Sequence, residues 1–426
     1  PRRWVGGMVG SLERRTGRRP NGEGTSRIRA LARRSIAGVR DVAANVVYRR
    51  SAGIVYADET RAGRARAAEE TLRELASRSA ISAGVLTSLP VYYRNLFTGQ
   101  ININESFFVG RDAKVRAAGP VVAGERGGGL RTALVSGARG AGKSTLCQQI
   151  ATAAGGTTHW LSPPPAGAAT RAALRSALEA ATGMQGTPKQ VASRLAPGSV
   201  LVVDDLDLWW ERRPGGLDAI DELLELVADT GDRVGYVLAG GDPALRVLGA
   251  LRPLARIVQT RVECQPLAAR ALEQVIMARH SSTGVRLRLG SRNGEGIGSL
   301  ARARLFDAHF DYALGNVGFA LRSWLAHVDA YADDVLTIRV PRVLDWDAID
   351  DLRAEHVAIL VELALHKSAS SEKLARTTGR AESVLAEAVA DLCAIGLVTK
   401  NRRRVVQINP FVHVPVTAWL DRRQLA

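Results

Sequence analysis

The chain has 426 residues, a net charge of +16 and 46% hydrophobic residues, values that are typical of a globular protein of two or three domains. It contains no run of the ~18 apolar residues that a spanning helix needs. The three cysteines lie far apart, in neither a metal-binding nor a disulfide pattern, so we expect a reducing, cytoplasmic compartment. If a membrane anchor precedes Pro1, the nearby arginines would form its cytoplasmic flank and the protein would be membrane-associated.

The N-terminal region, residues 1–85, is strongly basic. Residues 1–80 contain 18 arginines, no lysine and 8 acidic residues, a local charge of +10. Such a segment suits non-specific nucleic acid or an anionic membrane surface, and it is equally typical of a solvated arm. Residues 64–79 have the composition of an exposed helix, and we interpret the region as partly disordered or helical.

A glycine-rich loop is the clearest motif of the central region, residues 86–265. An apolar run with strand character ends at Leu134 and Val135, and a helix is predicted from Lys143. The intervening sequence fits G-x-x-x-x-G-K-[ST], and its residues are Gly137, Ala138, Arg139, Gly140, Ala141, Gly142, Lys143 and Ser144, followed by Thr145. Glycines let successive backbone N–H groups face a polyphosphate, and the helix dipole adds positive charge. We therefore predict that these residues bind ATP, with Lys143 on the β/γ-phosphates and Ser144 on Mg²⁺.

An acidic pair ends the apolar strand predicted at residues 200–203. Asp204 and Asp205 follow it directly, at the carboxyl end where open α/β sheets bind their ligands. In this Walker B pattern Asp204 would hold Mg²⁺ through water, and Asp205 would be the base that polarises the attacking water. Asp207 is expected on the surface or as a helix cap. Aspartate is one methylene shorter than glutamate, so slow hydrolysis is expected.

Two further segments resemble AAA+ and STAND ATPases. Phe108-Val109-Gly110-Arg111 resembles their VGR box, which implies that Val109, Gly110 and Arg111 contact the adenine. Residues 315–324 resemble the start of their last lid helix, which implies that Arg322 senses the γ-phosphate. The strand at 233–239 departs from the family, because Ala239-Gly240-Gly241-Asp242 has no neutral polar sensor. The candidates for an arginine acting on a neighbouring subunit are Arg252, Arg256 and Arg261.

The C-terminal region, residues 344–426, has the order helix, helix, helix, hairpin, which is typical of a winged helix. Its third helix carries only acidic charges, Glu382, Glu387 and Asp391, whereas the hairpin tip Arg402–Arg404 is basic. Because a helix in the major groove needs basic side chains against phosphate, we favour a protein contact over base reading. A lid that is helical is expected over residues 266–343, apart from a Gly/Arg-rich loop at 284–297.

The expected fold class is therefore α/β: a P-loop NTPase core with a parallel sheet, a helical lid and a C-terminal winged-helix domain, plus the basic N-terminal region. Two functions remain open. The favoured one is a slowly hydrolysing ATPase, converting ATP to ADP and phosphate, that acts as a nucleotide-driven switch or regulator and forms homo-oligomers on ATP binding. The alternative is a DNA-binding AAA+ initiator or loader. The catalytic residues implied are Asp205, Lys143 and Arg322.

Overall fold

The computed structural model describes residues 63–99, 107–290 and 298–425. The chain divides into two compact units, residues 1–66 and 67–426, and the second unit is described here by itself. The interpretation of residues 1–62 as a basic, partly disordered arm lies outside the described residues. Within the described ranges, no helix is both long and apolar enough to cross a membrane.

The centre of this unit is a parallel five-stranded sheet in the order β2-β3-β4-β1-β5. Its strands are β1 (Thr132–Ser136), β2 (Thr158–Leu161), β3 (Val200–Val203), β4 (Gly235–Gly240) and β5 (Thr260–Glu263). The helices around it are α5 (Asp112–Ala123), α6 (Lys143–Ala154), α7 (Arg171–Thr182), α8 (Pro188–Arg194), α9 (Asp218–Thr230) and α10 (Asp242–Leu251). The predicted α/β core with a parallel sheet is confirmed.

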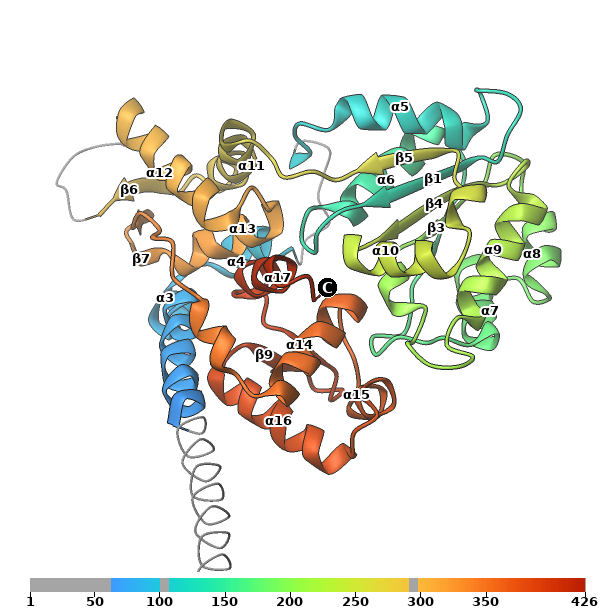
Figure 1. Cartoon of the computed structure of the whole chain (residues 1–426). Helices are drawn as coiled ribbons and strands as arrows, with labels where there is room; N and C mark the ends of the chain where they lie inside the picture. The colour runs from blue at the N-terminus through green and yellow to red at the C-terminus, as the bar shows by residue number, and fades with distance from the viewer. Residues whose placement is uncertain (1–62, 100–106, 291–297, 426) are drawn as a thin grey trace, which may run out of the picture. The chain divides into compact units, whose positions relative to one another are not determined.

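Helices cover both faces of this sheet. Val135 and Val202 belong to a buried cluster with α6, whereas their neighbours Leu134 and Leu201 belong to a cluster with helices α7 to α10. Figure 1 shows α5 above the strands and α7 below them. The continuous apolar run of β3 is what a strand buried on both faces requires. Because β1, β3 and β4 are parallel neighbours, the residues that follow them gather at one edge of the sheet.

The lid region combines helices with a second sheet. Its helices are α11 (Ala269–Ser281), α12 (Ser299–Ala313) and α13 (Val317–Ala326), and its strands are β6 (Arg286–Leu289), β7 (Val328–Ala332) and β8 (Val335–Ile338). The sheet order is β6-β8-β7, and α3 (Ala83–Ser88) and α4 (Val91–Thr98) share the lid's buried cluster. The interpretation of residues 286–289 as loop was wrong, because they pair with β8.

The C-terminal region follows the predicted order of three helices and a hairpin. It contains η4 (Asp347–Asp351), α14 (Ala354–His366), α15 (Ser371–Thr378), α16 (Glu382–Ile395), β9 (Val398–Lys400), β10 (Val406–Ile408) and α17 (His413–Arg422). The first helical segment is divided in two, because Leu352 is extended between η4 and α14.

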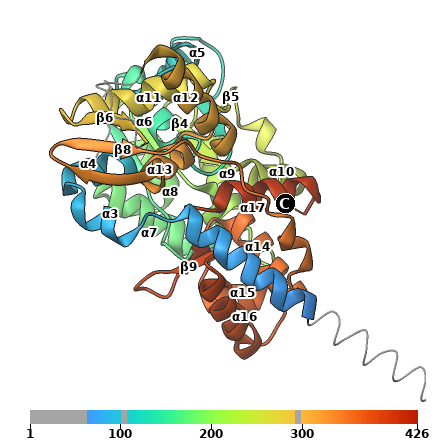
Figure 2. The same ribbon diagram turned by 90° about the vertical axis from the view of Figure 1, so that its left-hand side faces the viewer.

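The helix that ends at Ser79 is only partly exposed. Leu72, Leu75 and Ala76 are buried in the hydrophobic cluster of the C-terminal region, and Arg73 Nε donates to Ala394 O at the end of α16, 3.3 Å away. Figure 2 shows this blue helix alongside α14 to α16. The expectation of an exposed helix was therefore wrong for one of its faces.

Candidate functional site

The phosphate loop connects β1 to α6 at the carboxyl ends of the parallel strands. Gly137, Gly140 and Gly142 all have positive φ, of 150°, 80° and 92°, so the loop needs the backbone freedom of glycine. Lys143 begins α6, and its Nζ donates to Gly137 O at 2.9 Å and to Ala138 O at 3.1 Å. The ammonium is therefore folded back over the loop.

A cavity of about 810 Å³ opens above this loop. Most of the predicted cofactor-binding residues line it: Val109, Arg111, Ala138, Arg139, Gly140, Gly142, Lys143, Ser144 and Thr145. Gly110, Gly137 and Ala141 do not. The cavity is also lined by Asp205 and Arg322, so the two remaining predicted catalytic side chains face the same space as Lys143.

The predicted metal ligands lie together beneath the loop. The Ser144 side chain is hydrogen-bonded to Asp204, and burial together with the neighbouring Asp205 carboxylate raises the pKa of Asp204. A hydroxyl and a carboxylate oxygen side by side are the hard oxygen donors that Mg²⁺ prefers, with water completing its shell. These residues therefore fit a magnesium ion.

Part of the cavity lining is apolar. Phe107, Val109, Leu267 and Val275 form this part, which suits the flat face of a nucleotide base. Arg111 is buried beside the phosphate loop, where its Nη2 donates to Gln265 O at 3.1 Å. A Cβ atom added to Gly142 would lie only 2.8 Å from Arg111 Nη1. It therefore packs under the loop as well as lining the cavity.

The lid contacts the phosphate loop through the start of α13. Asn316 caps this helix by accepting from Phe319 N at 3.0 Å, and its Nδ2 donates to Arg139 O at 2.7 Å. Gly318 N donates to Gly140 O at 2.8 Å. One turn further on, Arg322 Nη1 donates to Gly318 O at 3.1 Å, and burial lowers the pKa of this guanidinium.

The C-terminal region contacts the same loop from another side. Arg139 Nη2 donates to Gln407 Oε1 at 2.7 Å and Nη1 donates to Lys367 O at 3.2 Å. His413 Nε2 lies 3.1 Å from Arg139 O. Burial, with Arg322 nearby, lowers the pKa of Arg139 to about 10, and burial lowers that of His413 to about 4. Arg139 is thus a residue of the phosphate loop that is enclosed by the C-terminal region.

Two further acidic residues lie near the loop. Asp207 is not on the surface: it is 5% exposed, and its carboxylate accepts from Gly241 N at 3.0 Å, at the start of α10. Burial raises its pKa. Asp242, the first residue of α10, lines the cavity and is hydrogen-bonded to Ser136, and burial raises its pKa.

The three candidate trans-acting arginines lie outside the cavity lining. Arg252 pairs with Asp221 of its own chain, with Nη2 2.9 Å from Oδ2, whereas Arg256 and Arg261 are exposed. The sequence interpretation also missed Lys367, Gln407 and His413. Each is a single residue without a surrounding motif, so no signal in the sequence assigned it to the site.

No family model matches the sequence, and neither does any curated protein. Similar solved structures include the Thermotoga maritima RuvB Holliday junction branch migration motor, at 17% identity over 72% of this chain and 95% of that chain, with a TM-score of 0.35. The Aeropyrum pernix Orc1 protein in complex with DNA has 16% identity over 79% and 98%, with a TM-score of 0.36. The Aeropyrum pernix Orc2 protein (ADPNP–ADP complexes) has 15% identity over 78% and 99%, with a TM-score of 0.34. The activity of this chain does not follow from these likenesses. Its P-loop NTPase fold follows from the strand order and the phosphate loop.

Proposed function

We propose that this chain is a slowly hydrolysing P-loop ATPase of AAA+/STAND type that works as a nucleotide-driven conformational switch. One observation carries the proposal. The carbonyl oxygens of Arg139 and Gly140, within the phosphate loop, accept hydrogen bonds from the lid residues Asn316 and Gly318, while the Arg139 side chain and carbonyl contact the C-terminal region. A ligand shifts a conformational equilibrium by its differential affinity for the two states. Nucleotide in this loop would therefore act on both regions at once.

The proposed roles follow from position. Loop N–H groups and Lys143 would bind the β- and γ-phosphates, and Ser144 and Asp204 would hold Mg²⁺, which neutralises charge on the phosphates when bound. Asp205 would take the proton of the attacking water. Arg322 would contact the γ-phosphate from the lid. Val109, Gly110 and Arg111 would form the base side of the site.

We propose residues 86–265 as the ATPase core, 266–343 as the lid and 344–426 as a winged-helix domain that binds a protein partner. The exposed residues of α16 include Glu382 and Glu387, which would repel DNA phosphate. Homo-oligomer formation on ATP binding belongs to the same proposal, with the exposed Arg256 and Arg261 as candidates for contact with a neighbouring γ-phosphate.

Two variants test the proposal. Lys143→Ala removes the cation from the phosphates and should weaken ATP binding at least tenfold, about 1.4 kcal/mol, measured by calorimetry. Asp205→Asn should leave ATP binding intact and abolish turnover, because the amide cannot accept the water proton. Equal ATP affinity of Lys143→Ala and the parent would contradict the assignment of the site.

A DNA-binding initiator or loader is the second candidate. The exposed cluster Lys400 and Arg402–Arg404 at the hairpin tip favours it, together with the arginine-rich segment of residues 1–80. Arginine–phosphate attraction is blind to sequence and falls with salt. Deleting residues 1–80 should therefore remove most DNA affinity and flatten its salt dependence. A truncated chain that still prefers one duplex sequence would favour this second function.

A further inference from the structure

Lys367 brings an ammonium group from the C-terminal region to the proposed catalytic base. It directly follows α14, and its Nζ forms an ion pair with Asp205 Oδ2. The two side chains are 35% and 21% exposed, and both line the nucleotide cavity. They lie 162 positions apart in the sequence, so the pair exists only while the C-terminal region rests on the ATPase core.

The backbone around this ion pair is held in an uncommon conformation. Asp205 has φ 54° and ψ 54°, and Lys367 has φ 60° and ψ −46°. Positive φ at a residue with a side chain costs about 1–3 kcal/mol and persists where the surroundings fix it. The neighbours of Lys367 do so: His366 Nδ1 lies 3.1 Å from Asp207 O, and Ser368 Oγ donates to Pro165 O at 2.6 Å. The ammonium is therefore positioned from both sides.

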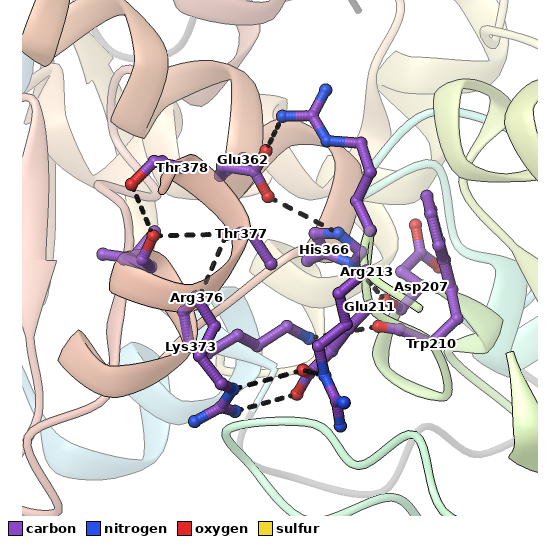
Figure 3. Close-up of polar contacts among 12 residues, drawn as sticks. Asp207, Trp210, Glu211, Arg213, Glu362, His366, Lys373, Arg376, Thr377 and Thr378 are labelled. Atoms are coloured by element: carbon purple, nitrogen blue, oxygen red, sulfur yellow. Dashed lines mark hydrogen bonds and ion pairs between the residues drawn. The ribbon is translucent and has the colours of Figure 1, made fainter. Parts of the chain in front are cut away.

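The rest of the contact between core and C-terminal region is rich in charge, as Figure 3 shows. Arg376 Nη2 lies 3.0 Å from Glu211 Oε1, and the buried Glu362 pairs with Arg212. Lys373 is buried close to Glu211, and burial lowers its pKa to about 8. When the C-terminal region separates from the core, water hydrates these charged side chains in place of their ion-pair partners.

The buried apolar clusters of the sheet, by contrast, do not extend into the C-terminal region, although the rings of Trp210 and His366 pack there with centroids 4.4 Å apart. The buried apolar cluster of the C-terminal region draws its described members from residues 72–76 and 346–420, whereas the two clusters of the sheet draw theirs from residues 118–264. An interface that is polar rather than hydrophobic is the kind that opens and closes within a chain. The contact therefore has the physical character of reversible docking.

We propose that Lys367 inhibits hydrolysis in cis while the C-terminal region is docked. In hydrolysis the water oxygen bonds to the γ-phosphorus, and the bond from that phosphorus to the β–γ bridging oxygen breaks, leaving its electron pair on ADP. The water proton passes to Asp205 and then to solvent. With Oδ2 occupied by the ammonium of Lys367, that oxygen is not available to the attacking water. Turnover then requires the C-terminal region to move away, whereas ATP binding does not. This inference rests on the proposed function.

The test is the turnover of full-length Lys367→Met at saturating ATP and Mg²⁺. Methionine keeps most of the length of the side chain and removes its charge. Turnover should therefore rise about tenfold or more, since a freed general base is worth at least that factor. ATP affinity should stay within about twofold of the parent, because the phosphate contacts are unchanged. Lys367→Arg keeps a cation and should retain most of the inhibition.

Lys189→Met is the matched control. It removes an exposed ion pair of the core, in which Lys189 Nζ lies 2.9 Å from Asp229 Oδ2, and it should leave turnover unchanged. A second variant, Arg376→Ala, breaks the pair with Glu211 outside the cavity lining. By loosening the docked region it should also raise turnover, and it carries the test if Lys367→Met does not fold.

The outcomes separate the inference from the proposed function. If Lys367→Met folds and turns over at the parent rate or more slowly, while ATP still binds and Asp205→Asn is inactive, Lys367 does not inhibit. If Lys367→Met does not fold, turnover at the parent rate in Arg376→Ala would likewise show that docking of the C-terminal region does not inhibit hydrolysis. A parent that binds no ATP, or an Asp205→Asn variant with full turnover, would instead overturn the proposed function.

Discussion

The lid and the C-terminal region both touch the phosphate loop, but with different chemistry. The lid uses a backbone N–H and a neutral amide: Gly318 N on Gly140 O and Asn316 Nδ2 on Arg139 O. The C-terminal region contacts the loop through Gln407 and His413 on Arg139. It adds an ion pair outside the loop, between Lys367 and Asp205. A neutral hydrogen bond needs close approach and responds little to salt, whereas an ion pair tolerates looser geometry and is weakened by salt.

This difference separates two tasks. The lid contact is short and steric, because a side chain on Gly318 would lie 2.7 Å from Gly140 O, so it reports the shape of the loop. The C-terminal contact acts on the acid that would drive hydrolysis. In the proposed switch, the lid would sense which nucleotide is bound, and the C-terminal region would decide whether that nucleotide is hydrolysed.

The largest expected effect comes from disturbing the contact between the lid and the phosphate loop. Gly318→Ala places a methyl group 2.7 Å from Gly140 O and 3.0 Å from Gly140 Cα, atoms of the backbone that cannot rotate away. Overpacking of this kind costs about 1–3 kcal/mol, so ATP affinity should fall by about 10- to 100-fold. Gly249→Ala is the control, because nothing lies within 4 Å of its added methyl, and it should bind ATP like the parent. Calorimetry measures both, and equal affinities would remove the steric role of the lid.

A smaller effect is expected for the nucleotide preference of the lid. Arg322→Ala should weaken ATP binding about tenfold, or ~1.4 kcal/mol, and should change ADP binding much less, because its proposed partner is the γ-phosphate. Hydrogen-exchange protection of residues 299–330 should then no longer differ between ATP and ADP. Arg304→Ala removes an exposed arginine of α12 and should keep the difference. If Arg322→Ala keeps it too, the lid responds through other contacts.

Local motifs made the α/β core predictable. The strand with its glycine loop and the Asp204–Asp205 pair are each a short contiguous motif, and their residue types are fixed by backbone geometry and phosphate chemistry. The burial of Leu72, Leu75 and Ala76 was also predictable from the sequence. Their positions i, i+3 and i+4 place them on one face of a helix. The alanines and arginines around them hid this face.

Long-range contacts and short strands were not predictable. Lys367 and Asp205 carry no mutual signal, because their pairing depends on how two regions pack. The strand Arg286–Leu289 alternates charged and apolar residues over four positions, too short a pattern to distinguish from a loop. Asp207 lies four residues after the predicted strand, and its burial depends on long-range neighbours such as Gly241 at the start of α10.

The smallest expected effect is the dependence of turnover on salt concentration. Raising the ionic strength shortens the screening length from about 10 Å at 0.1 M to about 3 Å at 1 M, which weakens the partly exposed pair Lys367–Asp205. Exposed pairs contribute less than ~1 kcal/mol each, so turnover at saturating ATP·Mg²⁺ should rise by only about threefold. The lid contacts are neutral, so hydrogen-exchange protection of residues 317–326 should not change.

In Lys367→Met the inhibiting charge is absent, and the rise of turnover with salt should largely disappear. A parent whose turnover is flat across this range, or a variant that rises as steeply as the parent, would show that charge does not hold the C-terminal region on the core.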